Sequence, residues 1–181
     1  MTLEDQHRSN DPASSAKRIV QAAGLGALMA CAVAAPAAER TVSVVETVQL
    51  AATPARTWAA INDFATWQAW HPAFASTRVV QGDGHSTGTV RVLTSQDGGN
   101  FTEELIAFDA ALRSYQYRII ESPAPVLDYV STIQVKETSS GSSVVWSSNF
   151  NVKPGTPEAD VRKLISGVYR AGLDHLASVV K

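Results

Sequence analysis

The segment 113–133 constrains the fold more than any other part of this sequence. It contains two runs in which residues of two kinds alternate, and a stretch with Pro123 and Pro125 lies between the runs. Alternation with a period of two is typical of β-strands that have one buried face. That face would carry Tyr115, Tyr117, Ile119, Tyr129, Ser131 and Ile133. Buried hydroxyl groups need hydrogen-bond partners, so this tyrosine-rich face is predicted to line a cavity.

The rest of the chain predicts further short strands between helical regions. Thr53 and Pro54 are a suitable N-cap and first turn for a helix that ends near Asn62, and a second short helix is expected at 64–68. Thr156 would cap a long helix that starts at Pro157 and carries an apolar stripe. Strands are predicted at 41–51, 76–81, 89–95, 101–108, 113–121, 128–137 and 144–152. Short strands in direct succession favour an antiparallel meander, and therefore an α+β fold.

Residues 1–37 are typical of a secretory signal peptide, so the mature domain would span 38–181. A basic pair at Lys17-Arg18 precedes an apolar run, and Ala35-Pro36-Ala37 offers a cleavage site. The apolar run is too short for a membrane span. A lipid anchor at Cys31 is the alternative, although Met29 fits a lipobox poorly. The expected location is periplasmic or secreted.

Composition and charge exclude several classes of function. The formal net charge is −2 and no basic run occurs, which argues against nucleic acid or an anionic membrane as a partner. The single cysteine lies in the leader, so the mature domain has no disulfide. Histidine and acidic residues show no metal-ligand spacing, and neither a metal nor a cofactor is expected. The protein is expected to be a monomer or a dimer.

Arg91 and Glu104 are the candidate catalytic pair. They lie on consecutive predicted strands joined by a turn at 96–100, and both are assigned to the inner face. A buried charge needs a partner, so the two would pair. The arginine would orient a ligand oxygen and the glutamate would transfer a proton. A purely structural ion pair is the alternative, and Glu103 replaces Glu104 if the register slips by one residue.

The remaining candidates are aromatic and polar residues expected to contact a ligand. His71, between Trp70 and Pro72, is either a donor at the cavity mouth or a structural histidine. Aromatic residues on one sheet face are either core or cavity lining. The predicted ligand-binding set is Trp70, His71, Phe74, Leu93, Ile106, Tyr115, Tyr117, Tyr129, Ser131, Trp146, Ser148, Phe150, Tyr169 and Leu173.

The order of elements resembles the helix-grip fold of the SRPBCC superfamily, which includes Bet v 1, START domains and polyketide cyclases/dehydrases. Local matches support the resemblance at Thr53-Pro-Ala-x-x-Trp58, Trp70-His-Pro72, Gly88-Thr-Val-Arg91, 103–109, 117–123 and 129–133. The resemblance implies a seven-stranded antiparallel sheet wrapped around a long C-terminal helix, with two short helices between the first two strands. It also implies a cavity for a hydrophobic or amphipathic small molecule.

Three functions remain open on this basis. The first is an exported protein that binds a small hydrophobic molecule. The second is a cyclase-, dehydrase- or isomerase-like enzyme that uses Arg91 and Glu104, because an arginine and a glutamate at similar positions serve catalysis in plant lachrymatory-factor synthase, which this region resembles. The third is a periplasmic accessory protein that acts on a protein partner without a ligand, similar to those encoded with methanol dehydrogenases.

Overall fold

A computed structural model describes residues 41–181 of the chain. The predicted signal peptide at 1–37 and Cys31 lie outside the described residues. The elements are, in order, β1 (Val42–Leu50), α1 (Pro54–Ile61), the 3₁₀ helix η1 (Trp67–Ala69), β2 (Phe74–Gln81), β3 (Val90–Ser95), β4 (Asn100–Asp109), β5 (Ser114–Glu121), β6 (Val126–Thr138), β7 (Gly141–Val152) and α2 (Glu158–Val179). Among these residues, neither helix combines the length and apolar character needed to cross a membrane.

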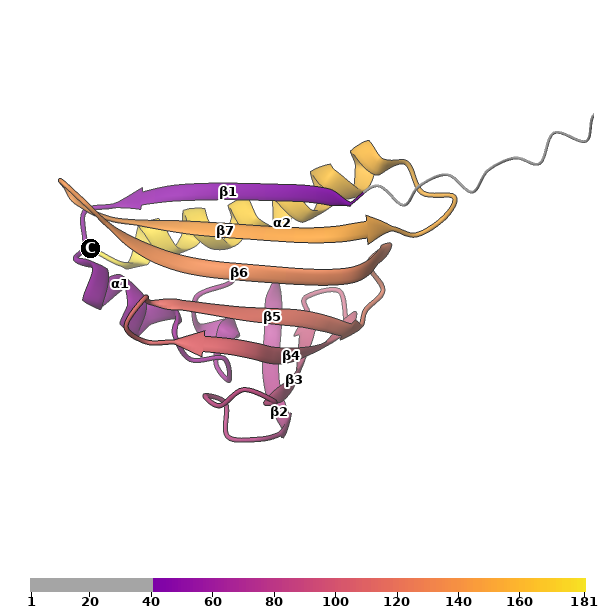
Figure 1. Ribbon diagram of the computed structural model, residues 1–181, viewed down its shortest axis with the longest axis horizontal. Coiled ribbons are helices and arrows are strands. Elements are labelled where there is room, and N and C mark those ends of the chain that lie inside the picture. Colours follow the sequence, from indigo (N-terminus) through magenta and orange to yellow (C-terminus); the bar gives the residue numbers. More distant parts are fainter. Residues whose placement is uncertain (1–40) are drawn as a thin grey trace, which may run out of the picture. The chain divides into compact units, whose positions relative to one another are not determined.

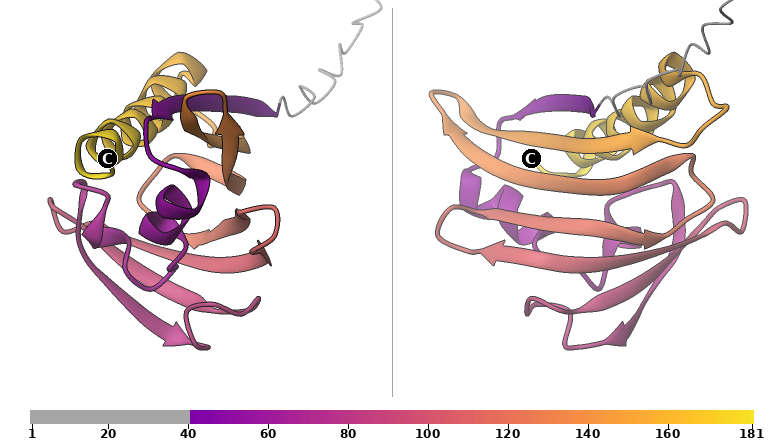
Figure 2. Two further views of the ribbon diagram at one scale, coloured as in Figure 1. Left: turned by 90° about the vertical axis from the view of Figure 1, so that its left-hand side faces the viewer. Right: turned by 45° about the vertical axis from the view of Figure 1, so that its right-hand side comes forward.

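The seven strands form one antiparallel sheet in the order β1-β7-β6-β5-β4-β3-β2 (Figure 1). Each strand from β2 to β6 pairs with the next one along the chain, and β1 pairs with β7. The sheet curls, and α2 lies along its inner side against β1 and β7 (Figure 2). The predicted α+β helix-grip fold is therefore confirmed.

Two predicted helix positions are wrong in detail. The expected helix at 64–68 is replaced by η1, because the side chain of Asp63 accepts a hydrogen bond from Ala65 N–H at 2.8 Å and forms a turn there. The long helix starts at Glu158 and not at Pro157, which holds an extended conformation as its N-cap residue. Thr156 does not cap the helix, because it precedes the N-cap residue and no side chain makes a capping hydrogen bond there.

The segment after η1 is fastened to α2 by two histidines. The His71 imidazole accepts a hydrogen bond from Ala73 N–H at Nδ1, so its Nε2–H donates to Val168 O at 3.1 Å. His175 Nδ1 bonds to Trp70 O at 2.8 Å. Gly172 makes this approach possible, because a Cβ atom there would lie 2.5 Å from His71 Cδ2 and 2.7 Å from Nε2.

Replacing Gly172 by alanine is expected to destabilise the protein. The added methyl group would have to displace a buried ring that is hydrogen-bonded on both sides, and overpacking of this kind costs about 1–3 kcal/mol. Gly167 on the same helix is the matched control, since nothing lies within 4 Å of a Cβ built there. Gly167→Ala should raise the free energy of unfolding by about 1 kcal/mol through helix propensity. Urea denaturation measures both, and equal effects would contradict the packing account.

Candidate functional site

Arg91 on β3 is completely buried, and the surrounding residues satisfy its charge. Its Nε and Nη2 donate to Oε2 of Glu103 on β4 at 2.9 and 2.6 Å, and Nη1 donates to Phe64 O at 2.8 Å. The guanidinium lies between two rings, 3.6 Å from the centroid of Phe64 and 3.8 Å from that of Trp67. Stacking and charge-assisted hydrogen bonds together compensate for the loss of hydration.

Glu103, and not Glu104, is the partner of Arg91. The predicted pairing with Glu104 is wrong because Ser95 N–H donates to Gly99 O at the end of the β3–β4 hairpin, and the register that follows pairs Thr94 with Asn100. Arg91 then lies directly opposite Glu103. A shift of one residue moves every side chain of a strand to the other face. Glu104 accordingly lies on the outer face and pairs with Arg118, whose side chain is 56% exposed.

Beside Glu103, a pocket of about 410 Å³ opens between the sheet and the first half of α2. Its walls come from η1 and β2 to β7, and its mouth lies near the β3–β4 and β5–β6 loops and Leu164, which is 47% exposed. Most of the lining is apolar or aromatic. The lining residues are Trp67, Ala73, Phe74, Ser95, Asp97, Gly99, Phe101, Glu103, Tyr117, Ile119, Pro123, Ala124, Tyr129, Trp146, Leu164, Ile165, Val168 and Tyr169.

A hydrogen-bond network joins the buried hydroxyl groups on the inner sheet face. Trp146 Nε1 donates to Ser131 Oγ at 2.9 Å and to Tyr117 OH at 3.2 Å. The hydroxyl of Tyr169 on α2 bonds to those of Tyr129 and Ser131. Burial holds the pKa of each of these three tyrosines well above its usual value, so all three stay neutral. The hydroxyl groups of Tyr117, Tyr129, Ser131 and Tyr169 therefore have partners without a ligand, whereas the buried hydroxyl of Ser148 has none among the described residues.

The structure separates the predicted ligand-binding residues into three groups. Those that line the pocket are Phe74, Tyr117, Tyr129, Trp146 and Tyr169. Those that are buried in the core away from the pocket are Trp70, His71, Leu93, Tyr115, Ser131, Ser148, Phe150 and Leu173. Ile106 belongs to neither group, and its predicted inward position is wrong because a β-bulge between Leu105 and Ala107 makes it the extra residue. Ligand contact by any of them stays a prediction.

Sequence reasoning missed the residue at the centre of the aromatic cluster. Trp67 lies 5.1–6.0 Å, centroid to centroid, from five other rings and donates from Nε1 to Tyr115 OH at 3.2 Å. It was expected in a short helix with no assigned role. The alternation of Phe101, Glu103 and Leu105 was an available signal for the inner face of β4. The equally regular alternation of Thr102, Glu104 and Ile106 concealed it.

His71 has the properties of a structural histidine. Burial lowers its pKa from the ordinary 6.5 to about 4, and the positive charge of Arg91 acts in the same direction, while the hydrogen bond to Val168 O opposes the shift. Its side chain is fully buried and both ring nitrogens are occupied. A ring that is neutral at physiological pH and has no free nitrogen is poorly suited to proton transfer.

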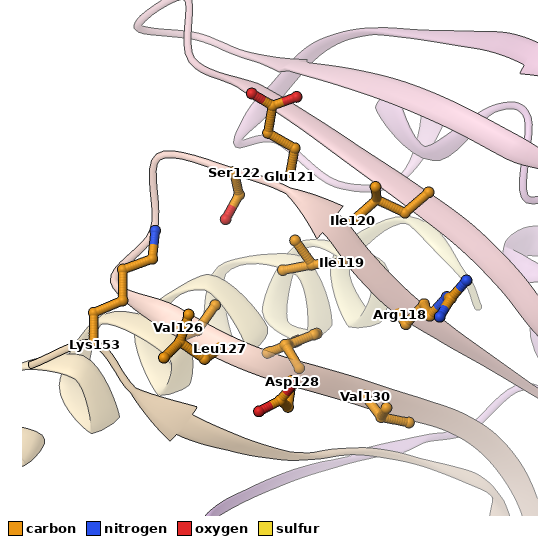
Figure 3. Close-up of a pocket in the computed structure, with 11 residues that line it drawn as sticks. Arg118, Ile119, Ile120, Glu121, Ser122, Val126, Leu127, Asp128, Val130 and Lys153 are labelled. Atoms are coloured by element: carbon orange, nitrogen blue, oxygen red, sulfur yellow. The ribbon is translucent and has the colours of Figure 1, made fainter.

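A second pocket, of about 510 Å³, lies where β5 and β6 separate (Figure 3). The pairing of these strands stops at Arg118 opposite Val130, and Asp128 beyond it has a φ of 52° in the left-handed region. The lining combines charges of both signs with exposed apolar residues. Ile119 and Tyr129 line both this pocket and the inner one.

Within residues 41–181, no group of three or more histidine, cysteine and acidic side chains is placed to hold a metal ion. Among the described residues that line the inner pocket, the buried carboxyl group is that of Glu103, which is 4% exposed. Burial raises the pKa of its carboxyl group, and the ion pair with Arg91 opposes that rise. A carboxyl group with these properties can accept a hydrogen bond or a proton from a molecule in the pocket.

Glu103→Gln and Glu104→Gln are expected to differ in their effect on stability. The first leaves the buried Arg91 without a counter-charge, which costs about 3–5 kcal/mol. The second removes one half of a surface pair worth about 0–1 kcal/mol. Urea denaturation of the two variants measures the difference. Similar losses, or a larger loss for Glu104→Gln, would contradict the register described above.

The comparisons with known proteins agree with this geometry. Residues 41–181 match the family model described as polyketide cyclase / dehydrase and lipid transport. The chain is similar to protein XoxI from Bacillus cereus, with 31% identity over 78% of this chain and 94% of that chain and a TM-score of 0.67. It is also similar to an uncharacterized protein from Bacillus thuringiensis, with 30% identity over 77% and 98% of the two chains and a TM-score of 0.71.

Ara h 8.0201 is 19% identical over 78% of this chain and 98% of that chain, with a TM-score of 0.65, and this likeness shows the Bet v 1-like fold alone. No match to a curated protein was found at the level of sequence. The family model covers all of the described residues and well over half of the sequence. The chain therefore belongs to the polyketide cyclase / dehydrase and lipid transport family of the SRPBCC superfamily.

Proposed function

We propose that this protein is exported and binds a small hydrophobic or amphipathic molecule in the pocket between the sheet and α2. The observation that carries the proposal is the composition of that pocket, in which Trp67, Phe74, Phe101 and Trp146 surround a single buried carboxyl group. Binding sites for small molecules are typically apolar concavities with a few polar groups, and a volume of about 410 Å³ lies within their usual range. Membership of the family supports ligand binding in general.

Export is supported by the sequence of residues 1–37, with its basic start, apolar run and Ala35-Pro36-Ala37 site. The proposed location is the periplasm or the exterior of the cell. The expected state, a monomer or a dimer, stays a prediction.

Mass spectrometry of the protein purified from its own host tests both parts of the proposal. Under denaturing conditions the chain should begin at Ala38, whereas an intact N-terminus or a lipid on Cys31 would contradict cleavage by a signal peptidase. Under native conditions the protein should carry an additional small mass that is lost on unfolding.

A pocket-filling variant supplies the matched binding experiment. Ile165 is buried on α2 and lines the pocket, so Ile165→Trp should lower the affinity for the neutral dye N-phenyl-1-naphthylamine by at least about tenfold, or 1.4 kcal/mol. Ser178 is exposed on the same helix and is not among the residues that line the inner pocket, so Ser178→Trp is the control. Equal affinities of the two variants, each confirmed to be folded, would contradict binding in this pocket.

An enzymatic function is the second candidate, and one observation favours it. Arg91 engages only Oε2 of Glu103, and no described residue donates to Oε1. The corrected assignment makes Glu103 the proton carrier and Arg91 the residue that positions it, because Arg91 is fully buried and does not line the pocket. A carboxylate held in this way can remove a proton from the carbon next to a carbonyl group and later return it.

Hydrogen exchange of an enolisable ketone tests the enzymatic candidate. In deuterated buffer, Glu103 should accelerate the exchange of the α-protons of 2-tetralone: the C–H bond breaks, the carboxylate takes the proton, and the enolate takes a deuteron back. NMR follows the loss of the proton signal. Folded Glu103→Gln should lose the acceleration, since an amide cannot accept the proton, while Glu104→Gln should keep it. No acceleration by the wild type would reject this candidate.

A further inference from the structure

The protein donates hydrogen bonds to only one of the two carboxylate oxygens of Glu103. Both hydrogen bonds from Arg91 end on Oε2, at distances of 2.9 and 2.6 Å. Oε1 receives no hydrogen bond from the part of the chain that the structure describes. A buried carboxylate oxygen gains free energy from each donor that it accepts. Because Glu103 lines the inner pocket, the remaining sources of such a donor are water and a molecule bound there.

Arg91 cannot supply a positive charge to a ligand, because the protein encloses it. Three of its N–H groups are bonded to Glu103 and Phe64, and the rings of Phe64 and Trp67 cover both faces of the guanidinium. It has no exposed surface and does not line the pocket. An anionic ligand in the pocket therefore has no access to this positive charge.

The other polar groups around the pocket do not attract an anionic ligand either. Asp97 at the mouth is the second charged residue of the lining, and no lysine, arginine or histidine is among the described residues that line it. The hydroxyl groups of Tyr117, Tyr129 and Tyr169 are bonded to Trp146, Ser131 and one another. The charge that faces a ligand is therefore negative.

We propose that the pocket selects apolar molecules that carry a hydrogen-bond donor, such as a phenol, an alcohol or an amine, with Oε1 of Glu103 as the acceptor. Carboxylates of the same shape are excluded, because their charge would face that of Glu103 where little water screens it. Glu103 is thus the specificity-determining residue. This inference rests on the proposed binding function and names the chemical class of its ligand.

Three probes with one naphthalene body test the preference at neutral pH. 2-Naphthol carries a donor, 2-methoxynaphthalene replaces the donor with a methyl ether, and 2-naphthoate carries a negative charge. Isothermal titration calorimetry measures the three affinities. The naphthol should bind at least about tenfold more tightly than the ether, since a hydrogen bond to a charged group contributes that much. The naphthoate should bind more weakly than the ether.

Variants assign the preference to a residue. Folded Glu103→Gln should lose the discrimination against naphthoate, because the charge is gone and the amide can donate to a carboxylate. Glu104→Gln, on the outer face, should keep the ranking of the wild type. If Glu103→Gln does not fold, the wild-type ranking decides. Equal affinities for naphthol and ether, or tightest binding of naphthoate, would overturn this inference and leave binding intact. No binding of any probe or of the neutral dye would overturn the proposed function itself.

Discussion

The ion pair between Arg91 and Glu103 determines the arrangement of this site. A guanidinium without exposed surface needs charge compensation and hydrogen bonds from every side. Glu103 on β4, the carbonyl of Phe64 and the rings of Phe64 and Trp67 provide them. These contacts join the β3–β4 hairpin to the segment between α1 and β2. They also engage one oxygen of the carboxyl group, Oε2, while no described residue donates to the other.

The aromatic residues divide the interior into a packed half and an open half. On one side Trp58 and Phe64 pack against Tyr115, and on the other the pocket lies beside the first half of α2. The histidine contacts keep the helix close to the segment after η1, and the absence of a side chain at Gly172 permits that distance. The pocket therefore depends on the position in which these hydrogen bonds hold α2, as well as on the residues that line it.

Much of the fold follows from local patterns that a reader of the sequence can recognise. The alternation in β5, β6 and β7 placed Tyr117, Tyr129 and Trp146 on the inner face, because a strand face repeats every two residues. The match of the whole order of elements to a known family then predicted the curved sheet and its helix. The error on β4 arose where two alternating sets, 101–105 and 102–106, are equally plausible. Both contain a glutamate, and the register of β4 against β3 decides between them.

The sequence by itself determined the succession of strands, the ends of most elements and the presence of a tyrosine-bearing inner face. These depend on backbone preferences and on periodicity, which are local properties. The tertiary structure decided which glutamate forms the ion pair with Arg91. It also decided that His71 is buried and hydrogen-bonded to α2, and that Trp67 is the centre of the aromatic cluster. Each of these depends on contacts between residues that are distant in sequence or on a one-residue choice of turn. Only the folded chain brings those atoms together, so only its geometry distinguishes the alternatives.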